Sequence, residues 1–327
     1  MSPSAAAQSL GPRHLGARGA GGEGGRAGMA AGRVGFLGLG IMGRAMAGRL
    51  AAEGAEVLAW NRSPAVAQEF AREHGAKVTA VADAAEVAAD CDVTFAMLAG
   101  PAAARSVAAA AAPGLRPGSS YVDCSTVDEG TGSEVEALVQ PRGAHFLSAP
   151  VSGGWRECEK GAALFLCGGS SEAYEAAASA MGIMGEKSWL CGETPAHAAR
   201  AKLCLQVSMG TLVASLAESL ALAEGAGVDK RMVHEMLQKS ALRSPMTAAK
   251  GLLMLDKSYA PNFQVYLQQK DLRLAMELGN ELDVQLPITA AANAMYVRAK
   301  HLGHANSDFA AVAEAYSDAG GAPSKEG

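Results

Sequence analysis

Apolar residues in the first two thirds of the chain fall into short runs separated by segments suited to helices. The short runs predict strands at 34–37, 56–60, 91–98, 120–124, 144–147, 163–168 and 187–190. Between them, helices are predicted at 44–52 and, with a proline in the first turn, at 64–74. Strands that alternate with helices form a parallel, doubly wound sheet, so this part is predicted to be α/β.

The pattern changes near residue 194. From Pro195 to Gly225 only Gly210 interrupts a helical run rich in Ala, Leu and Met, which predicts a helix on the order of 45 Å long. Asp229 is expected to cap the next helix, and later helices are punctuated by Pro245, Pro261 and Pro287. The C-terminal part is therefore predicted to be all-helical and joined to the sheet by the long helix.

These patterns divide the chain into four segments. Residues 1–32 are rich in Gly and Ala, with three arginines and one acid, and are expected to form a disordered extension or an organelle transit peptide. Residues 33–194 are expected to form the sheet domain. Residues 195–319 are expected to form a helical domain for substrate binding and oligomerisation, and 320–327 a tail.

Composition narrows the class of protein. Acids and bases are interspersed over 327 residues with a net charge of −5, which does not suggest nucleic-acid binding. No uninterrupted apolar run reaches the roughly 18 residues of a membrane helix. Six scattered cysteines without a C-x-x-C pair indicate reduced core thiols in an intracellular protein. His301 and His304 are interpreted as surface residues, and no metal site is predicted.

One segment carries a specific binding signal. Gly-Leu-Gly-Ile-Met-Gly at 38–43 follows a strand and precedes a helix, the context that a dinucleotide-binding loop requires. Gly38 is expected to make the tight turn, Gly40 to let the backbone approach a pyrophosphate, and Gly43 to open the helix and pack it close to the strand. Leu39, Ile41 and Met42 complete the predicted loop of a Rossmann domain.

The second strand indicates which dinucleotide binds. A site that prefers NAD usually has Asp or Glu about 20 residues after the glycine loop, but here the strand ends in Asn61-Arg62-Ser63. Arg62 can pair with a 2′-phosphate, and its two neighbours can add hydrogen bonds. NADP(H) is therefore the predicted cofactor; the alternative is that Arg62 is a solvated loop residue.

Catalytic groups are expected where the strands end. Hydride transfer to a carbonyl requires a nearby proton donor, and cofactors of this kind bind at the carboxyl ends of the strands. The long helix supplies Lys202, whose pKa would be lowered by desolvation; the alternative is a surface lysine. The loops concerned hold Met97-Leu98, Ser125-Thr126 and Ser152-Gly153-Gly154.

Five motifs in order resemble the β-hydroxyacid dehydrogenase family, which includes 3-hydroxyisobutyrate dehydrogenases. They are Gly-Leu-Gly-Ile-Met-Gly at 38–43, Asn61-Arg62, Asp123-Cys124-Ser125-Thr126-Val127, Ala149-Pro150-Val151-Ser152-Gly153, and Lys202 in an Ala-rich helix. Segments 268–275, 290–293 and 308–312 are similar to the glyoxylate/succinic semialdehyde reductase branch and to the related dehydrogenase domain of the nuclear cytokine-like factor. The resemblance covers about residues 33 to 318.

The resemblance implies residue roles. Lys202 would be the catalytic proton donor, while Ser152 and Gly153 would hold the substrate carboxylate. Thr126 would contact the nicotinamide side of the cofactor. Lys270 would reach the cofactor, and Phe263 and Asp271 would line the substrate pocket. From the residues alone, Lys270 and Asp271 are only a charged pair on a helix, for which a solvated face is the alternative.

Two departures from the family pattern border the expected substrate. Gln206 stands where the family usually has Asn, and residues 193–199 lack the usual glycines. The sequence therefore predicts an enzyme that reduces a small aldehyde acid, glyoxylate or succinic semialdehyde, with NADPH. The alternatives are a weakly active or inactive dinucleotide-binding scaffold and an NAD-dependent 3-hydroxyacid dehydrogenase.

The sequence also leads to expectations about the oligomeric state of the protein and its location in the cell. The apolar helical domain predicts a homodimer or homotetramer. A cytoplasmic location is expected, or a plastid or mitochondrial one if residues 1–32 act as a transit peptide.

Overall fold

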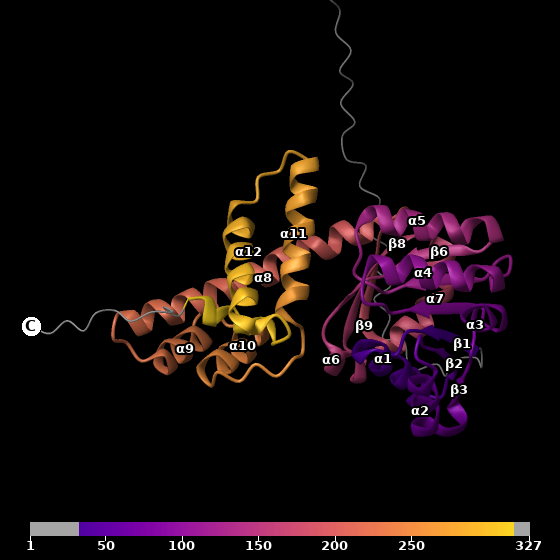
Figure 1. The fold of residues 1–327 in the computed structure, drawn as a ribbon, viewed down its shortest axis with the longest axis horizontal. Helices are drawn as coiled ribbons and strands as arrows, with labels where there is room; N and C mark the ends of the chain where they lie inside the picture. Colours follow the sequence, from indigo (N-terminus) through magenta and orange to yellow (C-terminus); the bar gives the residue numbers. More distant parts are fainter. Residues whose placement is uncertain (1–32, 317–327) are drawn as a thin grey trace, which may run out of the picture.

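The computed structural model describes residues 33–316, in which a sheet-containing part and a helical part are joined by one long helix, α8 (Figure 1). The predicted tails, 1–32 and 320–327, lie outside the described residues, as do 317–319 at the end of the predicted helical domain. α8 runs from Pro195 to Gly225, the bounds that the sequence predicts. Its first turns pack against the sheet part and its later turns against the other C-terminal helices (Figure 1).

The sheet has nine strands in the order β3-β2-β1-β4-β5-β6-β8-β7, with β9 paired to β8. The strands are β1 Arg33–Leu37, β2 Glu56–Trp60, β3 Val78–Ala80, β4 Val93–Ala96, β5 Ser120–Asp123, β6 His145–Ser148, β7 Val151–Ser152, β8 Ala163–Gly169 and β9 Gly185–Gly192. The first six are parallel, as predicted. However, β8 runs antiparallel to β6 and β7, so the sheet is mixed at this edge.

The antiparallel edge has a local cause. Only two residues separate β6 from β7, too few for the crossover that a parallel pair needs, and β7 instead pairs with β8. The sequence prediction placed Ser152-Gly153-Gly154 in a loop and did not identify β3 or β7. The chain turn between β6 and β7 places Ser152 at the end of a short strand.

Helices cover both faces of the sheet, and the C-terminal part is helical throughout the described residues. In the sheet part the helices are α1 Ile41–Ala52, α2 Pro64–His74, α3 Ala84–Asp90, α4 Pro101–Ala111, α5 Glu129–Val139, α6 Trp155–Glu159 and α7 Ser171–Met184. After α8 come α9 Lys230–Lys239, α10 Pro245–Leu255, α11 Val265–Glu281, α12 Pro287–Ala299 and the 3₁₀ segment η5 Phe309–Ala315. As predicted, Asp229 caps α9, accepting a hydrogen bond from the Arg231 backbone.

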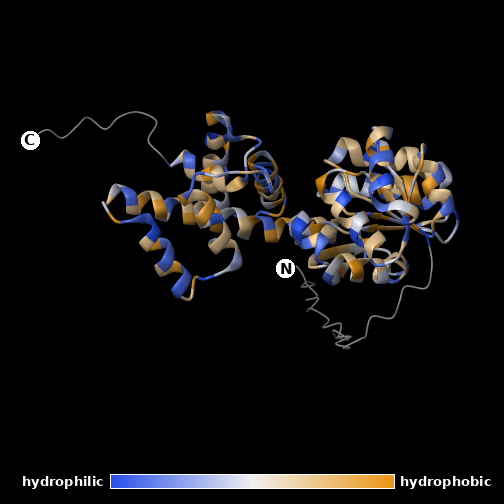
Figure 2. Ribbon diagram, turned by 90° about the horizontal axis from the view of Figure 1, so that it is seen from below, coloured by the Kyte–Doolittle hydropathy of each residue, from blue (hydrophilic) through white to orange (hydrophobic). Residues whose placement is uncertain are grey.

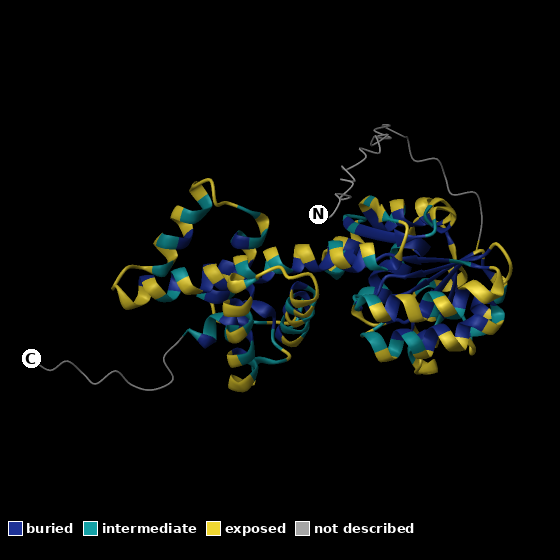
Figure 3. Ribbon diagram, turned by 90° about the horizontal axis from the view of Figure 1, so that it is seen from above, coloured by how far each residue is buried: buried dark blue, intermediate teal, exposed yellow. Residues whose placement is uncertain are grey.

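Each part has its own core. Because side chains alternate across a strand, Phe36 packs into the cluster on one face of the sheet and Leu37 into the cluster on the other. A third cluster joins α8, α11, α12 and η5 around Leu272, Tyr296 and Phe309. Figure 3 shows buried residues in the sheet and along the middle of the helical part.

Gly210 allows the helical part to assemble around α8. A Cβ there would lie 2.5 Å from Nε2 of Gln268 and 3.0 Å from the Leu272 side chain, so a larger residue would force these α11 side chains to move. The Tyr296 hydroxyl donates to the Gly210 carbonyl at 3.2 Å. By length and composition alone α8 could cross a membrane, but a core helix meets the same criteria, and one side of this helix is buried in the third cluster.

The cysteine prediction is partly wrong. Cys91, Cys124, Cys158 and Cys167 are buried, as core thiols should be, but Cys191 and Cys204 are exposed. Cys191 lies on the edge strand β9, and Cys204 lies on an exposed position of α8. Among residues 33–316 no three His, Cys, Asp or Glu side chains gather as metal ligands.

Candidate functional site

The glycine loop has the shape of a phosphate cradle. Gly38 has φ +99°, and a Cβ there would lie 2.5 Å from the Met97 carbonyl oxygen. Gly43 packs so closely that a Cβ would collide with the carbonyl oxygen of Gly38. Gly40 caps α1 and has open space where a Cβ would stand. The residues therefore fit a dinucleotide pyrophosphate at the helix N-terminus.

One detail of the predicted loop is wrong. The helix begins at Ile41 rather than at Gly43, because the Gly40 carbonyl already accepts the first helical hydrogen bond, from the Arg44 backbone at 2.9 Å. Gly43 therefore lies in the first turn. Ile41 is 58% exposed and Met42 is half-buried at the same turn.

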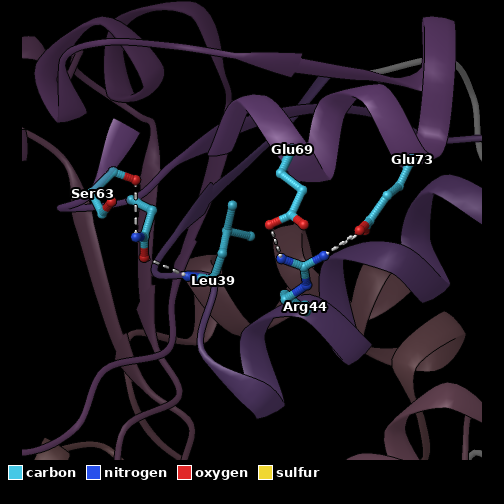
Figure 4. A network of polar contacts seen from close by, with 6 residues as sticks. Leu39, Arg44, Ser63, Glu69 and Glu73 are labelled. Carbon is cyan, nitrogen blue, oxygen red and sulfur yellow. Dashed lines mark hydrogen bonds and ion pairs between the residues drawn. The ribbon is translucent and has the colours of Figure 1, made fainter. Parts of the chain in front are cut away.

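The end of β2 is tied to this loop. The Asn61 carboxamide oxygen accepts from the Leu39 backbone at 3.0 Å, and its nitrogen donates to the Ser63 carbonyl at 3.2 Å (Figure 4). Both polar ends of Asn61 thus hold the protein's own backbone. A direct contact of Asn61 with the cofactor stays a prediction.

Two arginines near the loop differ in their surroundings. Arg44 on α1 is paired with Glu73, with N–O distances near 2.6 Å, and more loosely with Glu69 at 3.5 Å (Figure 4). Arg62 and Ser63 are exposed, and Arg62 forms no ion pair with residues 33–316. Of these two guanidinium groups, Arg62 is the one whose charge is not already matched.

A second set of loops is held at the ends of β4 and β5. The Leu98 backbone donates to the Ser125 hydroxyl at 3.0 Å, and the Ser125 backbone donates to Asp123 at 2.9 Å. Burial raises the pKa of Asp123 to about 6. Asp123 and Ser125 belong to a family motif, but of these two loops only Met97, Leu98 and Thr126 are predicted from the sequence to bind the cofactor. A polar residue at the last position of a buried strand was the available signal.

Lys202 on α8 is buried. The residue is only 6% exposed. Its ammonium group donates a hydrogen bond to the Val151 carbonyl at 2.8 Å. Burial lowers the pKa of Lys202 to about 8; nearby Asp271 counteracts the shift and Lys270 adds to it. The alternative of a surface lysine is therefore wrong, and the expected desolvation is confirmed.

Near this lysine, polar side chains from α8 and α11 form a network of hydrogen bonds and an ion pair. The Gln206 carboxamide donates to Oδ2 of Asp271, and Lys270 Nζ lies 3.0 Å from Oδ1 of the same carboxylate. Lys270 also donates to the Thr126 carbonyl at 3.1 Å, which links the helical part to the sheet. Asp271 is 2% exposed, so Lys270 and Asp271 are not a solvated pair.

The segment after β7, which includes Gly153 and Gly154, lies against the loop before α11. Gly153 has φ +120°, and the Gly154 backbone donates to Glu157 Oε2 at 2.8 Å. Asn262, which the sequence reasoning did not select, lies against Gly154. Its neighbour Phe263 stacks edge-on against Phe309, with ring centroids 5.7 Å apart.

The fold and this site define a class of protein: a dinucleotide-binding oxidoreductase with a Rossmann domain followed by a helical domain. Residues 33–192 match the NAD-binding domain of 6-phosphogluconate dehydrogenase, and residues 196–316 match the NAD-binding domain of NADP-dependent 3-hydroxyisobutyrate dehydrogenase. The chain belongs to the 3-hydroxyisobutyrate dehydrogenase-like β-hydroxyacid dehydrogenase family.

Similar proteins have names that refer to different functions. Glyoxylate/succinic semialdehyde reductase 2, chloroplastic, of Arabidopsis thaliana is 39% identical over 86% of this chain and 78% of its own length. The cytokine-like nuclear factor N-PAC of Xenopus tropicalis is 37% identical over 87% of this chain but only 53% of its own. A 3-hydroxyisobutyrate dehydrogenase structure from Salmonella typhimurium has a TM-score of 0.78 and 26% identity, covering 86% and 99% of the two chains.

Proposed function

We propose that this protein reduces a small aldehyde acid, glyoxylate or succinic semialdehyde, to the hydroxy acid with NADPH. The buried Lys202 ammonium, held at the Val151 carbonyl beside the substrate loop, is the observation that carries the proposal. A lysine with a pKa of about 8 is mostly protonated at neutral pH and gives up its proton more readily than an ordinary lysine, as a general acid should. The reductase names of the Arabidopsis relatives support this substrate class.

The residues divide the work of the reaction. NADPH, when bound, supplies the hydride to the carbonyl carbon. The Ser152 hydroxyl and the Gly153 backbone would hold the substrate carboxylate, because both offer hydrogen-bond donors. Lys202 would transfer one proton to the alkoxide oxygen, leaving a neutral amine and a hydroxy acid. Gln206, Phe263 and Asp271 would bound the pocket, while Lys270 would steady the Thr126 loop beside the nicotinamide.

We infer that the cofactor is NADP(H) rather than NAD(H). The support is the exposed Arg62 at the end of β2, together with the NADP-dependent family whose domain matches the helical part. Arg62 would pair with the 2′-phosphate, and Ser63 would add a hydrogen bond. Gly38, Gly40 and Gly43, with Leu39, Ile41 and Met42 between them, would carry the pyrophosphate.

The test is oxidation of NADPH by the purified protein, followed with a panel of short aldehyde acids. Lys202→Ala should abolish turnover and keep NADPH affinity nearly intact, whereas Lys239→Ala, an exposed lysine on α9, should change neither. In the same assay Arg62→Glu should lose most of the preference for NADPH over NADH. Unchanged turnover in Lys202→Ala would refute the role of the lysine.

A scaffold function is the second candidate. Gln206 donates to Asp271, and this pairing occupies an amide that the family pattern would offer to substrate. Full NADPH binding with no turnover across the panel would favour the scaffold. Turnover of 3-hydroxyisobutyrate with NAD, and none of the aldehyde acids, would favour the NAD-dependent dehydrogenase instead.

Assembly and location complete the proposal. We propose a homodimer or homotetramer formed through the helical part. A cytoplasmic location is proposed, or a plastid or mitochondrial one if residues 1–32 direct import; imaging of full-length and 33–327 fluorescent fusions would distinguish them.

A further inference from the structure

Two hydrogen bonds join the loops that follow β4 and β5. The Ser125 backbone donates to Oδ1 of Asp123 at 2.9 Å, and the Ser125 hydroxyl accepts from the Leu98 backbone at 3.0 Å. Asp123 and Ser125 are 2% and 1% exposed, so both side chains are shielded from water. We call this pair of bonds, from Asp123 through Ser125 to Leu98, the β4–β5 link.

The two linked loops have different neighbours. On one side, a Cβ on Gly38 would lie 2.8 Å from the Leu98 side chain, so the loop after β4 touches the glycine turn. On the other side, Thr126 directly follows Ser125, and its carbonyl accepts from Lys270 on α11 at 3.1 Å. The β4–β5 link therefore sets the spacing between a loop at the glycine turn and a loop at the helical part.

The strand order indicates which end of a dinucleotide these loops meet. In a doubly wound sheet each half binds one nucleotide, and here the halves are β1–β3 and β4–β6. The glycine loop and Arg62 follow strands of the first half, where the proposed 2′-phosphate would lie. The loops after β4 and β5 belong to the second half and therefore face the nicotinamide nucleotide.

Asp123 is a costly choice for a residue in this position. No cation of residues 33–316 pairs with it, and burial raises its pKa to about 6. Asparagine would keep an acceptor in the same place without a buried charge. What the carboxylate adds is a stronger hydrogen bond to the Ser125 backbone, because charged acceptors bind N–H groups more tightly than neutral ones.

We propose that Asp123 is a positioning residue that acts through Ser125 to hold the loops after β4 and β5 ready for the nicotinamide half of the cofactor. This inference rests on the proposed function for the identity of the cofactor. Without the β4–β5 link the loops would have to become ordered as the nicotinamide binds, which reduces affinity. Binding of the adenosine half should not depend on the link, because its loops follow other strands.

The test compares NADPH with 2′,5′-ADP, which carries the adenosine half and the 2′-phosphate but no nicotinamide. Dissociation constants are measured by calorimetry at a pH above the pKa of Asp123, where the carboxylate is charged. Asp123→Ala should weaken NADPH binding about tenfold, the effect expected of one hydrogen bond to a charged group, and leave 2′,5′-ADP binding unchanged. Asp92→Ala, which removes a carboxylate that is 88% exposed, should change neither.

The conservative variant separates positioning from folding. Asp123→Asn keeps an acceptor for the Ser125 backbone, so NADPH binding should weaken only about threefold. Its thermal unfolding temperature should rise, because a neutral amide is less costly to bury than a carboxylate. Weaker NADPH binding by a more stable protein cannot result from misfolding.

A double variant tests whether the two hydrogen bonds act together. Ser125→Ala removes the acceptor for the Leu98 backbone and should weaken NADPH binding as Asp123→Ala does. Because the two bonds act in series, Asp123→Ala/Ser125→Ala should lose about as much as either single variant. Thermal unfolding checks that each variant is folded.

Unchanged NADPH affinity in Asp123→Ala, equal weakening of NADPH and 2′,5′-ADP, or additive losses in the double variant would overturn the inference. Because no turnover is needed, its failure can be distinguished from failure of the proposed reaction. A silent aldehyde panel with a loss confined to NADPH would reject the reductase and support the positioning role. Turnover together with unchanged NADPH affinity in Asp123→Ala would reject only that role.

Discussion

At the residue scale, the free energy of the Lys202 ammonium depends on burial and on two charges from α11. Burial lowers the pKa of Lys202 to about 8, Asp271 counteracts this and Lys270 reinforces it. The folded-state pKa lies below the ordinary 10.5, so the folded protein binds fewer protons than the unfolded chain between about pH 8 and 10.5. The contribution of this residue to stability therefore increases as the pH rises through that window.

The same pKa predicts a pH dependence of catalysis. Reduction requires the ammonium form, so log kcat/KM should fall with a limiting slope of about −1 as the pH rises through about 8. Asp271→Asn should move the fall to lower pH, because a favourable charge is lost. Lys270→Gln should move it to higher pH, because a repulsive charge is lost. A profile with the same inflection in all three proteins would contradict this account.

At the element scale, a buried ion pair joins α10 to the segment before η5. Lys250 Nζ lies 2.8 Å from both carboxylate oxygens of Asp308 and 4.4 Å from the centre of the Phe309 ring. The exposed fractions of the two side chains are 8% and 0%. Asp308 also accepts from the Ala310 backbone at 3.0 Å, so the pair organises the segment that holds the loop before α11.

Removing one member of this pair should leave an uncompensated buried charge. Lys250→Met is expected to lower the free energy of unfolding by about 3–5 kcal/mol, measured by urea denaturation. The double variant Lys250→Met/Asp308→Asn should lose less than the two single variants together. As a control, Arg273→Met breaks an exposed pair with Glu277 and should cost about 0–1 kcal/mol. Equal losses at the two pairs would be inconsistent with the buried pair's stabilising role.

At the scale of the whole molecule, the candidate site combines residues from both parts of the chain. α8 carries Lys202 to the sheet part and Gln206 to α11, and Lys270 reaches back to the Thr126 loop. Hydrophobic residues occur along the outer helices of the helical part as well as in the sheet part (Figure 2). Met232 and Met236, one turn apart on α9, are 50% and 58% exposed, and Leu242 beyond them is 67% exposed.

These side chains suit the proposed contact between copies, since burying apolar area stabilises association. Met232→Glu/Met236→Glu should shift sedimentation towards the monomer, while Leu190→Glu, on the exposed edge strand β9, should not. A wild-type protein that sediments as a monomer at micromolar concentration would contradict the proposed oligomer.

The sequence by itself determined the elements whose causes are local. The glycine loop, the proline at the start of α2, the Asp229 cap and the uninterrupted α8 all follow from neighbours within a few residues. Family motifs indicated the remaining site residues, including Lys202. The sequence did not reveal how buried these residues are or which groups surround them. Spacing alone could not show whether Lys202 or Lys270 faces solvent.

Only the tertiary structure decided which distant groups meet. Gln206 and Asp271 are 65 residues apart and Lys250 and Asp308 are 58 apart, and Asn262, on the loop before α11, lies against Gly154 of the sheet part. The antiparallel β7–β8 edge likewise depends on a strand pairing that no local pattern encodes. Burial and hydrogen bonding are set by packing between elements, so the pKa of Lys202 and that of Asp123 emerged only from the fold.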